Sequence, residues 1–574
     1  MIAPSIREDD CPYLSLVVTA RNDDHGGNLL GRMQTFVNGW IAQARRYSLS
    51  SELIVVEWNP PEERKRLREV LKWPQDLGPC RVRFLEVPPD LHKLYRHADA
   101  LPLYQMIAKN VGIRRARGRF ILATNIDILF SDELMAFLAA RRLELGRMYR
   151  IDRHDVMSEV PVDGPLDEQL EYCRTHLLRM NTREGTFSLT PDGRRTLSAR
   201  DIAAPDSGVW LVRGWYPPEF TAEGEVFRWI DDDTDLAIAL KPESSAITLK
   251  LDLEPGPGMG HRPMSFQVLD GSQTILNVKI ECRTLLQVRL RSDREKHSLR
   301  LRIRGGGSLV PHDPRALNCR VFSCGVVDSQ QQSATASKGE SVAITPLKRD
   351  SGSKSIFRFW ERIQGVIRRV AEERPFVTIT LPVSPIIRRG AAFYVRKGGI
   401  TGMLGISLPA PHVSTSPDLQ TPRAEPLTYL HTNACGDFTL AAREHWFDLR
   451  GYPEFDEFSM NIDSVFCYAL HHGGAREEVL PEPMRIYHIE HGTGSGWTPE
   501  GQAALFERIA AKGLTFVSYQ EVMGWAAQMR RFNSPMIFNR EDWGLAKFEL
   551  QEYRPQPTCF GDPAQPDVRC VESA

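Results

Sequence analysis

The first 135 residues alternate between short, continuously apolar runs and longer segments whose apolar residues recur at helical spacing. The apolar runs have the length and composition of strands buried on both faces. They are LSLVVTA, ELIVVEW, CRVRFLEV and RFILATNID. The helical patterns between them cover about 29–47, 62–72 and 103–115. Strands separated by helices of this length predict an α/β fold with a parallel sheet covered on both faces.

From about residue 205 the pattern changes to short segments in which apolar and polar residues strictly alternate, such as AITLKLDLEP and HSLRLRIRG. Even spacing and Gly, Pro or Asp turns predict an antiparallel β-sandwich inserted at 205–327. Its tryptophan and tyrosine residues are Trp210, Trp215, Tyr216 and Trp229. They have the chemistry to stack on sugar rings, but aromatic side chains fill sandwich cores more often, so we favour a core role.

The segment 328–422 begins with a Ser/Gln-rich linker and continues into an amphipathic pattern at 354–373. Phe357, Trp360 and Ile363 fall on one side of the predicted helix, and several arginines fall elsewhere. Such a helix either lies on an anionic membrane or docks on the protein, and the pattern leaves both open. A second α/β segment at 423–550 and a C-terminal tail at 551–574 complete the expected organisation.

Composition narrows the partners and the compartment. The 574 residues are 42% hydrophobic and 25% charged, which is enough for more than one core. A net charge of -1 predicts no nucleic-acid partner. The ten cysteines form no close pairs, and we find neither a secretion-signal pattern nor an apolar run long enough to span a membrane. We therefore expect a cytoplasmic protein, with peripheral contact at the inner membrane face through 354–373 left open.

Polar residues stand where three of the four predicted strands of the first half end. They are Asn22, Asp23, Glu57, Asn59, Asn125 and Asp127. In parallel sheets, ligands bind beyond the carboxyl ends of the strands, so these side chains are expected to converge on one site. Turn formation and helix capping explain some of them, as for Ser131 ahead of Asp132 and Glu133.

The run AKNVGIRRARGRFILATNID resembles family 2 type glycosyltransferases of the GT-A fold. Asn110, Gly112, Ala116 and Gly118 match the helix and small-x-Gly exit that in this family precede a strand ending in Asp-x-Asp. The resemblance covers roughly 14–135 and 425–500. It implies a GT-A, Rossmann-like nucleotide-sugar-binding domain, with halves at 1–165 and 423–550, split by the antiparallel β-sandwich insertion.

The resemblance also implies an activity and a donor site. The reaction would be an inverting sugar transfer from a UDP- or GDP-sugar to a glycan or lipid-linked glycan, in polysaccharide or cell-envelope synthesis. The donor-binding residues would be Ala20, Asn22, Asp23, Glu57, Asn59, Asn110 and Asn125.

A diphosphate leaving group needs a hard divalent cation, here Mn²⁺ or Mg²⁺. Asp127 is the expected ligand, while Asn125 replaces the family's first Asp with a neutral oxygen. Enzymes of this fold often complete the metal or diphosphate site with a late histidine. His488 and His491 stand beside a glycine-rich loop, and we expect one of them to bind the ion.

The triplet Asn-Ile-Asp returns at 461–463, ahead of a helical run predicted to begin at Ser464. By resemblance, Gly436, Asp437 and Trp446 belong to the acceptor side, and Asp463 is the single base that deprotonates the acceptor hydroxyl. A helix N-terminus would keep such a carboxylate ionised. The competing interpretation is that Asp463 merely caps the helix.

Two other functions compete with glycosyl transfer. Sugar nucleotidyltransferases share the sheet architecture, but NDDHGGNLLG lacks their phosphate-loop sequence after the first strand. A non-catalytic glycan-binding protein with a degenerate GT-A domain would explain Asn125 and Ile462.

Overall fold

The computed structural model describes residues 11–557 except 206, 240–246, 291–295, 309, 311–312, 329–341, 347–376, 380–391, 397–398, 405–427 and 493–495. The chain divides into two compact units. One comprises Met1–Pro346 with Glu425–Ala574, and the other is Leu347–Ala424.

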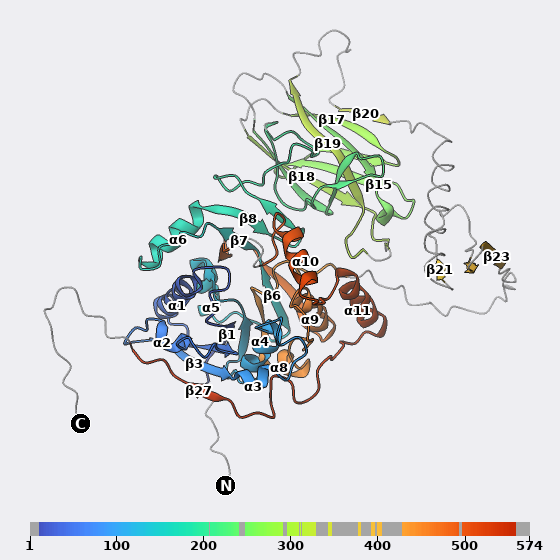
Figure 1. The fold of residues 1–574 in the computed structure, drawn as a ribbon. Helices are drawn as coiled ribbons and strands as arrows, with labels where there is room; N and C mark the ends of the chain where they lie inside the picture. The colour runs from blue at the N-terminus through green and yellow to red at the C-terminus, as the bar shows by residue number, and fades with distance from the viewer. Residues whose placement is uncertain are drawn as a thin grey trace, which may run out of the picture. The chain divides into compact units, whose positions relative to one another are not determined.

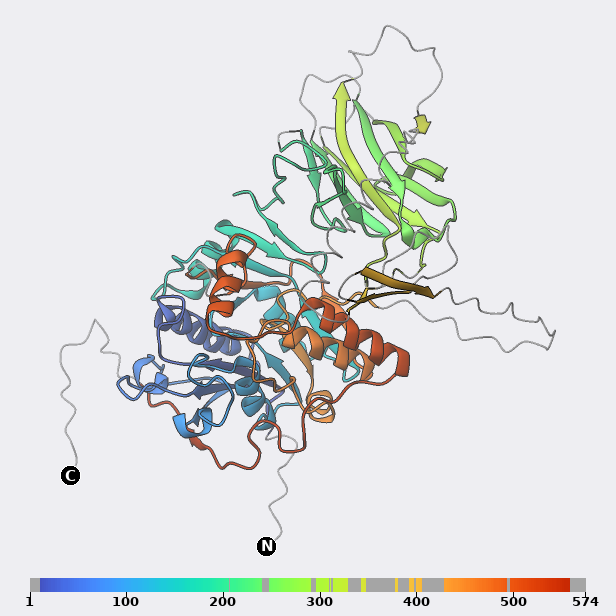
Figure 2. The same cartoon turned by 45° about the vertical axis from the view of Figure 1, so that its right-hand side comes forward.

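An eight-stranded sheet forms the centre of the α/β part (Figures 1 and 2). In spatial order its strands are β25 (Arg476–Leu480), β6 (Arg147–Ile151), β24 (Thr439–Ala442), β4 (Phe120–Ala123), β1 (Leu14–Ala20), β2 (Ser51–Trp58), β3 (Cys80–Val87) and β27 (Gln551–Tyr553). The four strands predicted from the first half pair in parallel. However, β24 is antiparallel to β4 and β6, and β27 is antiparallel to β3. The fold is therefore α/β as predicted, but the sheet is mixed because distant segments pair at its sides.

Successive residues of the central strands face opposite layers of helices, because strand side chains alternate. Val17, Ile54 and Val56 pack in the core that holds α4 and α9. Leu16 and Val18 pack in the core that holds α1 and α5. The helices are α1 (Leu29–Arg46), α2 (Leu67–Val70), α3 (Pro89–His92), α4 (Gln105–Arg114), α5 (Asp132–Ala139), α6 (Leu166–Thr175), α8 (Arg443–Asp448), α9 (Ile462–His472), α10 (Gln502–Ala511) and α11 (Tyr519–Phe532).

Local signals placed α1, α4 and the start of α5 well, but not α2. Ser131 Oγ accepts from the Leu134 N–H at 3.3 Å, so the predicted cap of α5 is confirmed. The helix expected at 62–72 shrinks to Leu67–Val70. The Glu57 carboxylate accepts from the Leu67 N–H and fixes the start of α2. The helix ends at Val70, since Leu71 has an extended backbone and Pro74 follows shortly after it.

The chain passes from the central sheet into a second sheet after β4 and again after β6. Its strands, in order, are β5 (Ile128–Phe130), β26 (Ile486–Ile489), β7 (Arg153–Val156), β8 (Leu177–Asn181) and β9 (Thr186–Ser188). The run predicted as one strand through Asp127 therefore splits into β4 and β5, which belong to different sheets. The peptide at Asp127 passes from one sheet to the other.

The middle of the chain forms two antiparallel sheets around one apolar core, the class predicted from its alternation. One sheet contains β10 (Val209–Leu211), β13 (Asp233–Ala239), β18 (Lys296–Arg304), β15 (Met264–Asp270) and β16 (Gln273–Ile280). The other contains β11 (Glu219–Phe220), β12 (Val226–Ile230), β19 (Cys319–Asp328), β14 (Ile247–Pro255), β17 (Thr284–Leu290) and β20 (Val342–Pro346). Because β20 pairs with β17, these strands extend beyond the predicted limit at 327.

The sandwich aromatics that were candidates for sugar stacking are mostly buried. Trp215 is 0%, Tyr216 2% and Trp229 6% exposed. Their rings lie within the protein, as the core interpretation expects, and offer little surface to a glycan.

The remaining segments modify the expected organisation. The strands β21 (Val377–Ile379), β22 (Ala392–Arg396) and β23 (Gly399–Leu404) form a small antiparallel sheet in the second unit. The amphipathic pattern at 354–373, with its proposed membrane contact, lies outside the described residues. The predicted tail at 551–574 begins as β27 of the central sheet, so its first residues are part of the fold. Among the described helices, none has the length and apolarity to cross a bilayer.

Candidate metal and base site

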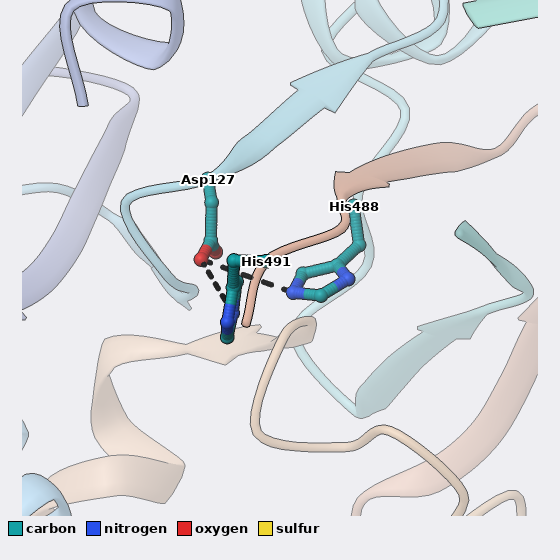
Figure 3. A group of neighbouring side chains, drawn as sticks. All are labelled: Asp127, His488 and His491. Carbon is teal, nitrogen blue, oxygen red and sulfur yellow. Dashed lines mark ion pairs between the residues drawn. The ribbon is translucent and has the colours of Figure 1, made fainter. Parts of the chain in front are cut away.

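Asp127 lies where the chain leaves β4 and enters β5, and two histidines from the second half of the chain face it (Figure 3). The His491 Nε2 is 3.3 Å and the His488 Nε2 3.8 Å from the Asp127 Oδ2. His488 belongs to β26, which pairs with β5 so that His488 lies opposite Ile128. The Ile489 N–H also donates to the Asp127 carbonyl at 2.9 Å. Strand pairing therefore brings these three residues together.

A glycine turn before α1 makes room for His491. Gly26 has φ +74°, and a Cβ there would meet the His491 Nδ1 at 2.7 Å. The Gly492 N–H donates to the Gly26 carbonyl at 2.8 Å. Gly26 of NDDHGGNLLG thus permits the close approach of His491, because a side chain at position 26 would require the histidine to shift.

Burial alone would raise the pKa of the Asp127 carboxyl, but His488, His491 and Arg32 outweigh it and hold the pKa well below its usual range. Arg32, from α1, donates to the Asp127 Oδ2 at 2.8 Å, and both side chains are buried. Sequence reasoning missed Arg32. The only feature of the sequence that could have indicated a role for Arg32 is its position as a charged residue on the apolar side of α1, beside Leu29, Met33 and Phe36.

The residues present fit a divalent ion. The Asp127 Oδ1 is buried and makes no hydrogen bond within the described chain, so one carboxylate oxygen remains for a ligand. Asp127, His488 and His491 each offer a ligand atom, all within 4.8 Å of one another. Two imidazoles and one carboxylate suit Mn²⁺ better than Mg²⁺, which prefers oxygen ligands. The expectation of a single histidine is not what the geometry indicates, since both reach Asp127.

Both side-chain polar atoms of Asn125 make hydrogen bonds to residues other than Asp127, His488 and His491. Its amide nitrogen donates to the Asp437 Oδ1, and its oxygen accepts from the Gln105 Nε2 at 3.0 Å. The other Asp437 oxygen accepts from Arg153 at 2.5 Å. The neutral residue is therefore explained by its neighbour: an amide can donate to the Asp437 carboxylate, whereas an aspartate at 125 would repel it.

The second triplet opens α9, which begins at Ile462 rather than at Ser464. Asn461 is the N-cap residue, with φ 63°, and Asp463 lies in the first turn. The Asp463 Oδ1 accepts from the Ser464 N–H at 3.0 Å. Burial raises the pKa of Asp463, and Cys435, Lys109 and the Ser464 N–H only partly oppose it. This reverses the expectation that the helix start would favour the ionised form.

Gly436 and Asp437 connect the two triplets. A Cβ on Gly436 would meet the Asp463 Oδ2 at 2.9 Å, so glycine permits the close approach of that carboxylate. Asp437 bonds Asn125 of the first triplet. The fully buried Lys109 donates to the Gly436 carbonyl at 2.6 Å. Burial lowers the pKa of Lys109 to about 8, although Asp437 and Asp463 act in the opposite direction.

The remaining predicted donor residues divide into two groups. Ala20, the last residue of β1, lies opposite Glu57, the penultimate residue of β2, and Asn22 lines a pocket with Asp24, Asn28 and Arg64. Glu57 is 1% exposed, and burial raises its pKa to about 7.

Asp23 and Asn59 are held locally. Asp23 pairs with Arg21 at 2.8 Å. Asn59 has φ 48°, and its side chain donates to the Pro102 carbonyl at 3.2 Å. The same Arg21 also donates to the Asn59 carbonyl at 2.7 Å, so these strand ends are tied to each other.

Two predicted site residues lie in the core. Asn110 is 0% exposed, and its amide bonds both the Tyr452 N–H and carbonyl and the Glu454 carboxylate, which uses its capacity for hydrogen bonds. Trp446 is 0% exposed, stacks on Phe466 and donates to the Ile121 carbonyl. We therefore assign Asn110 to holding the Tyr452 turn and Trp446 to packing, instead of donor and acceptor contacts.

Sequence reasoning also missed a charged layer behind the histidines. Asp155 lies on β7 and is 1% exposed, with Arg153 at 2.8 Å and Arg179 at 3.0 Å. The alternation of Arg153 and Asp155 on one strand was the available signal.

Comparison of the chain with known proteins gives no match, either to a family model or to a curated protein.

Proposed function

We propose that this chain is a divalent-metal-dependent glycosyltransferase of the GT-A type, which transfers a sugar from a UDP- or GDP-sugar to a glycan or lipid-linked acceptor with inversion. One observation carries the proposal. Asp127 and two histidines are grouped as ligands that could hold a metal ion, and the triplet that contains Asp127 is linked through Asp437 and Gly436 to Asp463, a carboxylate of raised pKa.

The sheet topology supports the same function. The parallel strands β3, β2, β1 and β4 end at one edge of the sheet, where ligands bind in open α/β sheets, and Asn22 and Asp127 follow β1 and β4 at this edge. The antiparallel β24 brings Gly436 and Asp437 to this edge, since both precede its first residue, Thr439. One edge thus combines a pocket lined by Asn22 and Arg64 with a metal-type cluster.

The proposed reaction is a single displacement. Asp463 takes the proton of the acceptor hydroxyl as its oxygen bonds to the anomeric carbon, and the bond from that carbon to the diphosphate oxygen breaks. A carboxyl whose pKa lies above the ordinary value is a stronger base than a surface aspartate. Arg32 supplies positive charge beside Asp127 as the diphosphate leaves.

A bound divalent ion would be held by Asp127, His488 and His491 and would stabilise charge on the leaving diphosphate. Arg32 already balances the Asp127 charge, and the two imidazoles are neutral ligands when they bind a metal. The protein therefore offers little net negative charge to a cation. We expect firm Mn²⁺ binding only when a nucleoside diphosphate adds its own charge.

The decisive experiment is incubation of the full chain with a panel of UDP- and GDP-sugars, with Mn²⁺ or with EDTA, and identification of the released nucleotide. A glycosyltransferase releases nucleoside diphosphate in the presence of Mn²⁺, and Asp463→Asn should abolish most of that release. Release of nucleoside triphosphate from sugar nucleotide and pyrophosphate would instead indicate a nucleotidyltransferase. Donor binding without turnover, even with varied acceptors, would favour a glycan-binding protein.

A further inference from the structure

His488 lies between two carboxylates, one facing each of its ring nitrogens. Its Nε2 is 3.8 Å from the Asp127 Oδ2, and its Nδ1 is 3.4 Å from the Asp155 Oδ1. β26 and β7 pair in parallel with His488 opposite Asp155, so the backbone register holds the two residues side by side. The orientation of the imidazole is therefore set by two different strands.

Asp155 is a fixed group. It is 1% exposed, and its Oδ2 accepts from the Arg179 Nε at 3.0 Å and from the Asn181 Nδ2 at 3.3 Å. Arg153 contacts its Oδ1 at 2.8 Å. Within the described chain, neither the Asp155 Oδ1 nor the His488 Nδ1 makes a hydrogen bond of good geometry, although both atoms are buried. A small rotation of the ring would satisfy both atoms at once.

We propose that Asp155 is a positioning residue: it accepts the Nδ1–H of His488 and thereby directs the Nε2 lone pair towards the ion held by Asp127 and His491. A neutral imidazole carries its proton on only one nitrogen, so an acceptor at Nδ1 selects the tautomer that can bind a metal through Nε2. Carboxylates that bond the outer nitrogen of a metal-binding histidine also fix its ring orientation. This inference rests on the proposed function only in that the ion is the one used there.

A cation on the other side of the ring is the competing arrangement. Asp155, His488 and Glu490 also offer three ligand atoms within 4.8 Å. Arg179, however, pairs with both Asp155 and Glu490. A second cation would have to displace or face this guanidinium, at an electrostatic cost. The arrangement favours Asp155 as a hydrogen-bond acceptor and Arg179 as the cation that occupies this position.

The first test reads the tautomer directly, in the full chain without metal. Selective ¹⁵N labelling of histidine and long-range ¹H–¹⁵N correlation, assigned by loss of the His488→Gln signal, should show Nδ1 protonated and Nε2 as the acceptor. A protonated Nε2 with an unprotonated Nδ1 in the unaltered protein would overturn the proposal, whether or not any variant folds.

Asp155→Asn should reverse the tautomer. Arg153 and Arg179 are donors only, so they attract the oxygen of the new amide and leave its NH₂ group for His488, which must then accept at Nδ1. Asp152→Asn is the matched control, because Asp152 instead pairs with His431, at 2.9 Å. The control should leave the His488 spectrum unchanged. An unchanged tautomer in a folded Asp155→Asn protein contradicts the assignment.

The second test measures Mn²⁺ affinity in the presence of UDP or GDP, by electron paramagnetic resonance. Asp155→Asn should weaken Mn²⁺ binding by about 10- to 100-fold, the range usual for loss of such a partner, and Asp155→Glu should recover part of it. Equal affinity in the Asp155→Asn and unaltered proteins would contradict the proposal. Loss of Mn²⁺ binding in Asp155→Asn but not in Asp127→Asn would place the ion at Asp155, His488 and Glu490 instead.

These outcomes separate this inference from the proposed function. If no sugar nucleotide is turned over while the tautomer and Mn²⁺ affinity respond as expected, the transferase proposal fails and the role of Asp155 stands. If turnover is observed while the tautomer is Nε2–H, the reverse holds.

Discussion

The same tripeptide, Asn-Ile-Asp, occurs at 125–127 and at 461–463 in two different settings. The first spans the passage from a parallel strand into the second sheet, and its carboxylate meets Arg32 and two histidines. The second opens α9, and its carboxylate lies close to Gly436 and accepts from the Ser464 N–H. The pKa of Asp127 is lowered and that of Asp463 is raised.

The asparagines differ as much as the aspartates. Asn125 is a bridge in the site, since it donates to Asp437 and accepts from Gln105. Asn461 instead shapes the backbone at the start of α9. It adopts φ 63°, and its side chain donates to the Val517 carbonyl at 2.8 Å. Identical local sequence therefore gives opposite electrostatics, because the partners come from distant segments.

Removing the two carboxylates separates their roles most strongly in the rate of transfer. Asp463→Asn should lower the rate by about 10²- to 10⁴-fold, as expected for loss of a general base. Donor and Mn²⁺ binding, measured by thermal shift and electron paramagnetic resonance, should persist. Transfer at a near-normal rate would show that another group is the base, and Asp437 and Asp456 are the next carboxylates to test.

Asp127→Asn and Asp463→Asn should differ in their effect on the free energy of unfolding. Asp127→Asn breaks a buried ion pair and leaves Arg32 without its carboxylate, which should cost about 3 kcal/mol of unfolding free energy. Asp463 has a folded pKa above its unfolded value, so its ionisation destabilises the folded state as pH rises above the unfolded value. Asp463→Asn should therefore leave the protein equally or more stable at pH 7. Urea unfolding of both variants decides this, and a less stable Asp463→Asn would contradict the raised pKa of that carboxyl.

The acid side of the activity profile follows from the same shift. Because Asp463 must be ionised to act as a base, activity should fall as pH decreases through its raised pKa, at a higher pH than for an ordinary aspartate. The measurement is kcat/KM against pH with a saturating metal concentration. A rate that stays constant down to the ordinary range of an aspartate would oppose the assignment.

Exchanging amide for carboxylate tests the difference between the two asparagines. Asn125→Asp places a second carboxylate against Asp437 and should destabilise the fold by about 1–3 kcal/mol, the range for a buried polar group that loses its partner. Asn461→Asp is the matched comparison: aspartate tolerates positive φ but cannot donate to the Val517 carbonyl, so this variant should lose stability, though less than Asn125→Asp, which sets two carboxylates against each other. Equal losses of unfolding free energy in the two variants would show that Asn125 and Asn461 do not differ in their roles.

The smallest expected effect concerns the backbone alone. Asn461→Ala should cost about 1 kcal/mol, since alanine disfavours positive φ and lacks the bond to Val517. Asn461→Gly relieves the first cost but not the second, so it should lose less. Melting temperatures of the two variants, ordered with alanine lower, would support this origin.

The sequence by itself determined the features that depend on local patterns. Continuous apolar runs predicted the parallel strands, strict alternation predicted the antiparallel sheets, and Ser131 predicted the start of α5. These signals are readable because strand and helix periodicities and caps act over a few neighbouring residues. The sequence also indicated a metal site, because Asp127, His488 and His491 have side chains that bind metals.

Only the tertiary structure decided how those residues act. It paired β26 with β5 and β7, which brought both histidines to Asp127 and placed Asp155 behind one of them. It also buried Asn110 and Trp446 and raised the pKa of Asp463 where the helix start alone predicted the ionised form. Burial and charge depend on neighbours hundreds of residues away along the chain, and a pKa responds to the sum of all of them. For that reason the tripeptide Asn-Ile-Asp has two different environments in the same chain.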